Sequence, residues 1–169
     1  MTSTVFVNGV TLTDDDWFND VNRLHYTIFG DPADISAVRS SLGITTGTVA
    51  STFTFDGSGG TTGSLTMEWR KEGNFVRLFI PTAQATSGTG STVLSSNTAL
   101  PASVRPTAAI QYQLSAPVLN NGTAATTPGL LGVTTAGTVT LNRDGLGTAF
   151  SNSATAGTSG NTSISYYVG

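Results

Sequence analysis

The chain has 169 residues, of which only 10% are Lys, Arg, Asp or Glu, and its formal net charge is −3 at pH 7. An average soluble protein holds about 25% charged residues, so this chain is poor in charge. Gly, Ser and Thr together fill 68 positions. The absence of cysteine excludes disulfides and thiolate metal sites, and one histidine leaves little for zinc or iron. The negative charge and the lack of a long apolar run argue against nucleic-acid binding and membrane insertion. We therefore expect no metal, cofactor, nucleic acid or membrane span.

Charge is distributed unevenly along the chain. Residues 1–56 contain seven acidic and two basic side chains, whereas residues 57–169 contain three acidic and five basic ones. The composition also changes near residue 46. This asymmetry predicts two modules with different roles, an N-terminal segment over residues 1–46 and a C-terminal domain over residues 47–169.

The N-terminal module begins with the signal of a short hairpin, because valines flank the dipeptide Asn8-Gly9. Two helices are expected to follow, the first capped by Thr13 and the second beginning at Asp31-Pro32. Their apolar residues repeat at helical spacing, and a monomer would expose this stripe unless it packed on the β module. We therefore expect self-association or docking on a larger partner. The stripe comprises Trp17, Val21, Leu24, Ile28, Ile35, Val38 and Leu42.

Residues 44–169 have the pattern of short β-strands separated by Gly, Pro and Asn. Strands at this spacing indicate an antiparallel sandwich rather than βαβ units. The expected fold class is therefore mainly β, with a short α-helical N-terminal anchor before a β-sandwich knob. The expected strands are 49–55, 65–69, 74–80, 108–114, 117–119, 130–134, 138–142 and 163–168, with turns at 70–73 and 136–137.

The run VNGVTLTDDDWFNDVNR over residues 7–23, continued by FGDP over residues 29–32, is a dense motif. It resembles the N-terminal segment of bacteriophage virion appendage proteins, such as tail fibres and tailspikes. The resemblance covers about the first 45 residues and implies that they dock on the particle or form the seam of a trimer. The residues that it assigns to this role are Asn8, Gly9, Trp17, Phe18, Asn19, Asp20, Val21, Leu24, Ile28 and Phe29.

The C-terminal module resembles the β-rich head of several phage fibres. The similar segments are WRKEGNFV over residues 69–76, LPASVRP over 100–106, GTVTL over 137–141 and ISYYV over 164–168. The resemblance implies a homotrimeric β-sandwich knob, and threefold packing would cover the sheet edges of such a charge-poor domain. The chain departs from longer fibres because no shaft separates the anchor from the head.

Few residues could support catalysis. His25 is the one possible base of a Ser-His-Asp arrangement, and a position inside the first expected helix favours a surface or interface role. Glycan cleavage would need two of the carboxylates Glu68, Glu72 and Asp144, but the long β-helix that carries this chemistry in tailspikes is missing. We therefore expect no enzyme activity and assign no catalytic residue.

Carbohydrate sites combine exposed aromatic rings with a few polar groups. The candidate glycan contacts are the Tyr and Trp residues of the β module, Trp69, Tyr112, Tyr166 and Tyr167. Tyr166 and Tyr167 are adjacent and therefore point to opposite faces of a strand, so that one can be buried while the other is exposed. Each of the four could instead lie in the core or in a trimer interface.

The sequence thus favours a non-enzymatic structural protein of a phage virion. Its partners would be further copies of itself, other virion proteins and a host surface glycan, which three knobs would bind multivalently. The leading prediction is a short trimeric tail fibre. One alternative is a trimeric capsid cement or head-fibre protein that stabilises the capsid, and another is a fragment of a depolymerising tailspike.

Overall fold

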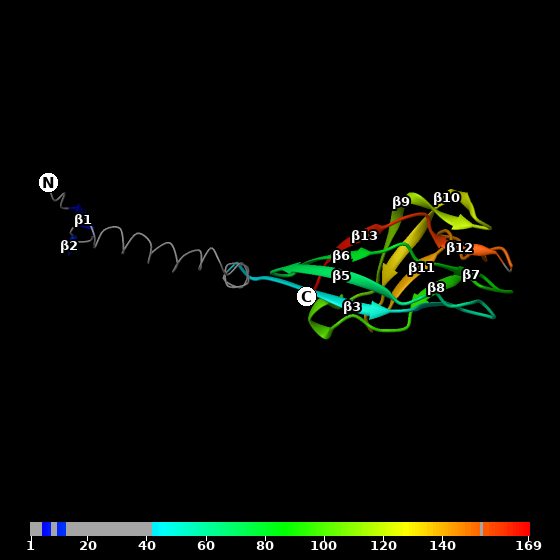
Figure 1. The fold of residues 1–169 in the computed structure, drawn as a ribbon, viewed down its shortest axis with the longest axis horizontal. Helices are drawn as coiled ribbons and strands as arrows, with labels where there is room; N and C mark the ends of the chain where they lie inside the picture. The colour runs from blue at the N-terminus through cyan, green and yellow to red at the C-terminus, as the bar shows by residue number, and fades with distance from the viewer. Residues whose placement is uncertain (1–4, 8–9, 13–41, 153) are drawn as a thin grey trace. The chain divides into compact units, whose positions relative to one another are not determined.

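A computed structural model describes residues 5–7, 10–12, 42–152 and 154–169 of the chain (Figure 1). The chain divides into two compact units, Met1–Thr45 and Thr46–Gly169. Regular structure in the described residues is β-strand, apart from one 3-10 turn at Ala102–Val104. The predicted mainly β class is therefore confirmed for this part of the chain.

The first unit contains a two-stranded antiparallel ladder. β1 (Val5–Val7) pairs with β2 (Val10–Leu12), which confirms the pairing predicted around the Asn8-Gly9 dipeptide. The two predicted helices lie outside the described residues, except for the last residues of the second. The ten residues predicted to dock on the particle or form a trimer seam also lie outside them.

The second unit contains a large antiparallel sheet of seven strands in the order β4-β8-β11-β10-β9-β12-β7. At its centre β9 and β10 form a long hairpin, whose turn residues Asn121 and Gly122 have φ angles of 58° and 68°. Positive φ at both positions is the geometry of a type I′ turn, which Asn-Gly favours. The strands are β4 (Phe53–Phe55), β7 (Gln84–Thr86), β8 (Val93–Ser96), β9 (Ile110–Asn120), β10 (Thr123–Val133), β11 (Val139–Asn142) and β12 (Thr155–Thr158).

The seven-stranded sheet curls until its two end strands are almost joined. A segment at Gly60–Thr62 pairs with β4, where the Thr62 N–H donates to the Phe53 carbonyl oxygen at 2.8 Å. The Gly60 N–H donates to the carbonyl oxygen of Thr86 in β7 at 2.7 Å. This short segment therefore links the first strand of the sheet to the last, and the sheet is a nearly closed barrel.

A smaller sheet has four strands in the order β13-β6-β5-β3. β5 and β6 form a hairpin whose two-residue loop is Gly73-Asn74, and Gly73 has a φ of 57°. The sequence placed this turn at residues 70–73, whereas the structure keeps Arg70, Lys71 and Glu72 paired within β5. The strands are β3 (Ile44–Ser51), β5 (Leu65–Glu72), β6 (Phe75–Ile80) and β13 (Thr162–Tyr167).

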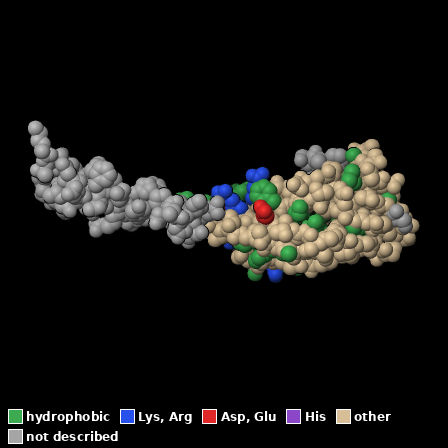
Figure 2. Space-filling model, in the orientation of Figure 1, with side chains coloured by type: hydrophobic (Ala, Val, Ile, Leu, Met, Phe, Trp, Pro, Cys, Tyr) green, Lys and Arg blue, Asp and Glu red, His purple; other side chains and the backbone are tan. Residues whose placement is uncertain are grey.

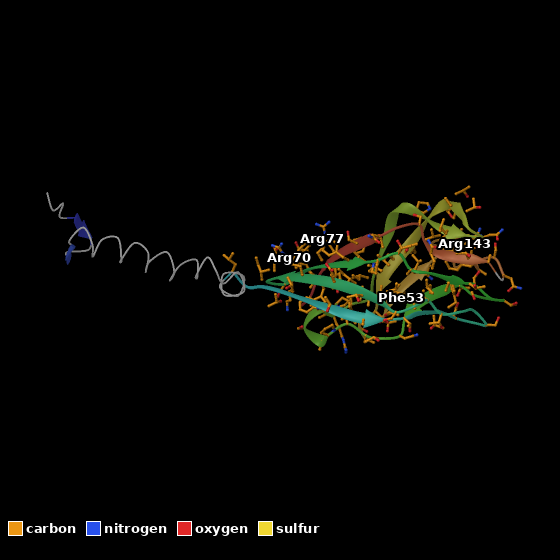
Figure 3. The ribbon with its side chains drawn as sticks, viewed as in Figure 1. Phe53, Arg70, Arg77 and Arg143 are labelled. Carbon is orange, nitrogen blue, oxygen red and sulfur yellow. The ribbon has the colours of Figure 1, made fainter. Side chains whose placement is uncertain are left out.

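One hydrophobic core lies between the two sheets. The smaller sheet contributes Met67, Val76 and Leu78, and the larger sheet contributes Leu131 and Phe53, which is labelled in Figure 3. Full burial of an aliphatic side chain of this size contributes about 1.5–3 kcal/mol. Two sheets around one core agree with the predicted antiparallel sandwich, but the larger sheet is barrel-like rather than open.

Candidate functional site

The outward face of the four-stranded sheet concentrates charged and aromatic side chains. Along β6, Phe75, Arg77 and Phe79 point away from the core, because Val76, Leu78 and Ile80 are buried beneath them. Figure 2 shows coloured side chains gathered over this part of an otherwise mostly tan surface. We call this set the outer face. It comprises Glu68, Arg70 and Glu72 of β5, Phe75, Arg77 and Phe79 of β6, and Tyr167 of β13.

Strand register sets the neighbours on the outer face. Glu68 lies opposite Phe79, and Arg70 lies opposite Arg77. Figure 3 shows these two arginines close together, pointing away from the sheet. Like charges directly opposite each other destabilise a sheet, so both guanidinium groups need other partners.

Each of the two arginines has such a partner. Arg70 forms an ion pair with Glu72, with Nη2 and Oε1 2.6 Å apart and both side chains about half exposed. The guanidinium carbon of Arg77 lies 4.7 Å from the centroid of the Phe79 ring, a cation–π contact. An exposed ion pair contributes only about 0–1 kcal/mol, so these contacts orient the side chains more than they stabilise the fold.

A hollow of about 310 Å³ lies between β3 and β5 on this face. Thr46 and Thr48 line it from β3, while Glu68, Arg70 and Phe79 line it from β5 and β6. The Glu68 carboxylate makes no hydrogen bond or ion pair with another described residue. The hollow therefore combines an aromatic ring, hydroxyl groups and a carboxylate that is available to accept hydrogen bonds.

Trp69, a predicted glycan contact, borders this hollow, but it lies opposite the buried Leu78 and packs against the core, so its ring is not part of the outer face. Its indole lies against the backbone of Gly47, where an added Cβ would come within 2.4 Å of the ring carbon Cζ2. The indole Nε1 is buried and has no hydrogen-bond partner in the described part of the chain. Trp69 is therefore half-buried, and the glycine at position 47 makes room for it.

A second hollow of about 260 Å³ lies beside the first, toward β13. Glu68 and Phe79 line both hollows, so this pair forms the wall that they share. Thr66 of β5 and Asn161, next to β13, contribute polar groups to the second hollow. The two hollows are therefore neighbours on the smaller sheet, with the Glu68–Phe79 pair between them.

The adjacent tyrosines of β13 face opposite sides, as the sequence predicts. Tyr167 is 73% exposed and its ring makes an edge contact with Phe75, with ring centroids 5.4 Å apart. Tyr166 is only 2% exposed, and its hydroxyl donates to the Val104 carbonyl oxygen at 2.7 Å. Burial raises the pKa of Tyr166 to about 12. Tyr166 therefore belongs to the core and is removed from the candidate glycan contacts.

Tyr112, the fourth candidate, lies on the other sheet. It belongs to β9, opposite Leu131 of β10, and is 49% exposed. The structure thus brings Trp69 and Tyr167 to the smaller sheet but places Tyr112 on the seven-stranded one.

The carboxylates considered for glycan cleavage do not suit that chemistry. Glu68 and Glu72 stand four residues apart on β5, about 13 Å along a strand, whereas catalytic carboxyl groups lie roughly 5–9.5 Å apart. Asp144 follows β11 and holds its loop by accepting from the Leu146 and Thr148 N–H groups at 2.8 and 3.1 Å. Hydrogen bonds hold the pKa of Asp144 below its ordinary value, and the bond from the Thr148 side chain has the largest effect. A general acid needs a raised pKa instead.

Two further features bear on possible ligands. The part of the chain that the structure describes contains no group of three or more His, Cys, Asp or Glu able to hold a metal ion. Within the same residues, no helix has the length and apolar character needed to cross a membrane.

Sequence reasoning missed Phe79, which lines both hollows and is 40% exposed. The signal was present in β6, where alternation puts Phe79 in phase with the charged Arg77 and out of phase with the aliphatic residues. Phe79 was not predicted because the candidate glycan contacts were restricted to tyrosine and tryptophan.

No protein-family model matches the chain, and no curated protein sequence matches it either. Among solved structures, the receptor-binding protein gp15 of Listeria phage PSA is similar, with 19% sequence identity and a TM-score of 0.50. The match covers 93% of this chain and 80% of that one. The reovirus attachment protein sigma1, solved with alpha-2,3-sialyllactose, has 16% identity over 99% of this chain and 95% of that one, with a TM-score of 0.49. The likeness to gp15 is one of fold.

Proposed function

We propose that this protein is a non-enzymatic structural protein of a bacteriophage virion, a short trimeric tail fibre whose knob contacts a glycan on the host surface. The observation that carries the proposal is the outer face, where the exposed Phe79 ring borders two hollows that also contain hydroxyl groups and the Glu68 carboxylate, which has no partner among the described residues. Sugars present both apolar ring faces and hydroxyl donors, and the outer face offers a partner for each.

Two further observations support a role in the virion. The fold is similar to that of gp15, a receptor-binding protein of a phage, and the N-terminal motif resembles phage appendage proteins. In this proposal residues 1–46 dock on the particle, and Trp17, Phe18 and the other residues of the motif provide the contact or the trimer seam. Three knobs then multiply the weak affinity of each glycan site.

The binding role can be tested with the full chain, labelled with a fluorophore and mixed with a panel of bacterial strains. We expect binding to some strains and its loss when periodate oxidises their surface sugars. Phe79→Ala should reduce this binding about tenfold, because truncating a central aromatic contact removes much of the energy of an interface. Leu146→Ala is the matched control, since this side chain is 90% exposed but lies outside the outer face. Binding that survives periodate would refute a glycan receptor.

The location in the virion separates the tail fibre from the capsid alternative. Immunogold labelling of intact phage with antibodies against residues 47–169 should place gold on the tail. Gold spread over the head would refute the fibre and favour a cement or head-fibre protein, whose removal should then destabilise the capsid.

A further inference from the structure

We infer that the outer face binds an internal stretch of a neutral, linear oligosaccharide, laid across the four strands so that successive sugar units occupy the two hollows. This inference rests on the proposed function, because it specifies the ligand of the same site. It concerns the length, direction and charge of the glycan.

The size of the two hollows argues for more than one sugar unit. The hollows have volumes of about 310 and 260 Å³, the first at the lower end of the range of about 300–1,000 Å³ for small-ligand sites and the second just below it. They lie on either side of the Glu68–Phe79 pair, one toward β3 and the other toward β13. Crossing four strands at the usual spacing covers about 14 Å, which is longer than a single sugar ring. Both hollows are open at the surface, so they suit a chain that continues beyond the site.

The Glu68–Phe79 pair gives the bound oligosaccharide a central contact. Arg77 stacks on the Phe79 ring and restrains it before any ligand arrives, which lowers the entropy lost on binding. The Glu68 carboxylate stands directly across the strand pair from this ring and can accept hydrogen bonds from hydroxyl groups on both sides. A sugar whose ring face contacts Phe79 and whose hydroxyl groups donate to Glu68 is held in one orientation.

The charges that line the hollows favour a neutral ligand. Glu68 borders both hollows, so an acidic sugar would meet a carboxylate in either one. Arg70 lines the first hollow, but its charge is already paired with Glu72. Arg77 lines neither hollow. An uncharged, hydroxyl-rich chain therefore fits better than a polyanion.

The test fills the hollows one at a time. Thr48→Trp places a large side chain at the first hollow and Thr66→Trp at the second, and both are exposed strand positions where an aromatic residue is tolerated. Thr123→Trp in β10 is the matched control, an exposed strand threonine on the other sheet. The ligand probe is the surface polysaccharide of a strain that the full chain binds, hydrolysed and separated into fragments of one to eight units.

For the unchanged chain we expect affinity to rise with fragment length until both hollows are filled, and then to level off. Each hollow-filling variant should bind the longest fragments about tenfold more weakly and should level off at a shorter length. Phe79→Ala should weaken binding of every fragment. Affinity should change little between about 50 mM and about 500 mM NaCl, because no ion pair with the ligand is screened.

Several results would overturn this inference while leaving the proposed function intact. Single sugars that bind as tightly as long fragments would exclude a two-hollow site, and so would an effect of only one filling variant. A strong loss of affinity in high salt would exclude a neutral ligand. A Phe79→Ala protein that changes its oligomeric state in light scattering but keeps its affinity would make the outer face a contact between copies. If the full chain bound no strain, the proposed function would fail and this inference with it.

Discussion

The hydroxyl of Tyr166 is a polar atom in an otherwise apolar environment. Its ring is packed in the core, and the hydroxyl donates to the Val104 carbonyl oxygen of the 3-10 turn. Because a net hydrogen bond contributes about 1 kcal/mol, Tyr166→Phe should lower the free energy of unfolding by about that amount. Urea denaturation at pH 8 measures this, with Tyr167→Phe as a control that should be neutral.

The same tyrosine makes stability depend on alkaline pH. Its pKa is about 12 in the folded protein against an ordinary value of 10.0, because burial disfavours the phenolate. Between these values the folded state binds more protons than the unfolded state, so stability falls as the pH rises from about 10 toward about 12. The advantage of the natural chain over Tyr166→Phe should therefore shrink in urea denaturation above pH 10. A difference that stays constant to pH 12 would contradict this assignment.

How much of the site could be predicted differs from residue to residue. Strand alternation correctly placed Tyr166 and Tyr167 on opposite faces, and Ile164, two residues earlier, carried the information that Tyr166 is the buried one. The hollows were not predictable, because they arise where β3 lies beside β5 and where residue 161 meets β6. Such neighbours are far apart in the sequence, and a local pattern carries no information about them.

At the scale of the elements, the pairing of β3 with β5 depends on one glycine. The Cβ of an alanine at position 47 would lie 2.4 Å from the Trp69 ring, a distance that requires either the ring or the strand to move. Gly47→Ala should therefore destabilise the protein by about 1–3 kcal/mol. It should also weaken glycan binding, because a shift of β3 would displace Thr46 and Thr48, which line the first hollow.

Gly63→Ala is the matched control, because a Cβ at that position has open space around it. Thermal unfolding of both variants, followed by circular dichroism, tests the prediction. Equal midpoints of thermal unfolding for the two variants would show that the Trp69 indole is not in close contact with Gly47.

Strand prediction succeeded where large apolar residues alternate clearly and failed where they do not. β6 and β11 were predicted within a residue, because Val76, Leu78 and Ile80 alternate in β6 and Val139 and Leu141 alternate in β11. β7, β8 and β12 have three or four residues, many of them Ser, Thr or Gly, and only tertiary pairing identifies them as strands. The Asn121-Gly122 turn, by contrast, was a strong local hairpin signal that should have predicted β9 and β10 as one long hairpin.

For the whole molecule, the predicted trimer and N-terminal anchor remain predictions. Light scattering of the full chain at micromolar concentration should give three times the monomer mass of 17.3 kDa. A stable monomer would contradict both the fibre and the cement proposals.

Trp17→Ala tests the anchor separately. It should prevent incorporation into phage particles, because it removes the largest apolar side chain of the predicted docking stripe, yet leave the strands of residues 46–169 folded. Circular dichroism of the purified variant and the protein content of purified particles measure the two outcomes. Normal incorporation of the variant would refute the assignment of Trp17 to the contact.

The position of β3 has a mechanical consequence for a particle held on a cell. The knob is joined to the preceding residues through β3, and the proposed glycan site lies on β3 itself and on its neighbours in the same sheet. Tension between virion and host would therefore be carried within the four-stranded sheet and would bypass the seven-stranded barrel. Ladder hydrogen bonds lie across the strands, so a pull along β3 loads them together in shear rather than one after another. The smaller sheet would bear the tension of attachment, and the barrel would carry little of it.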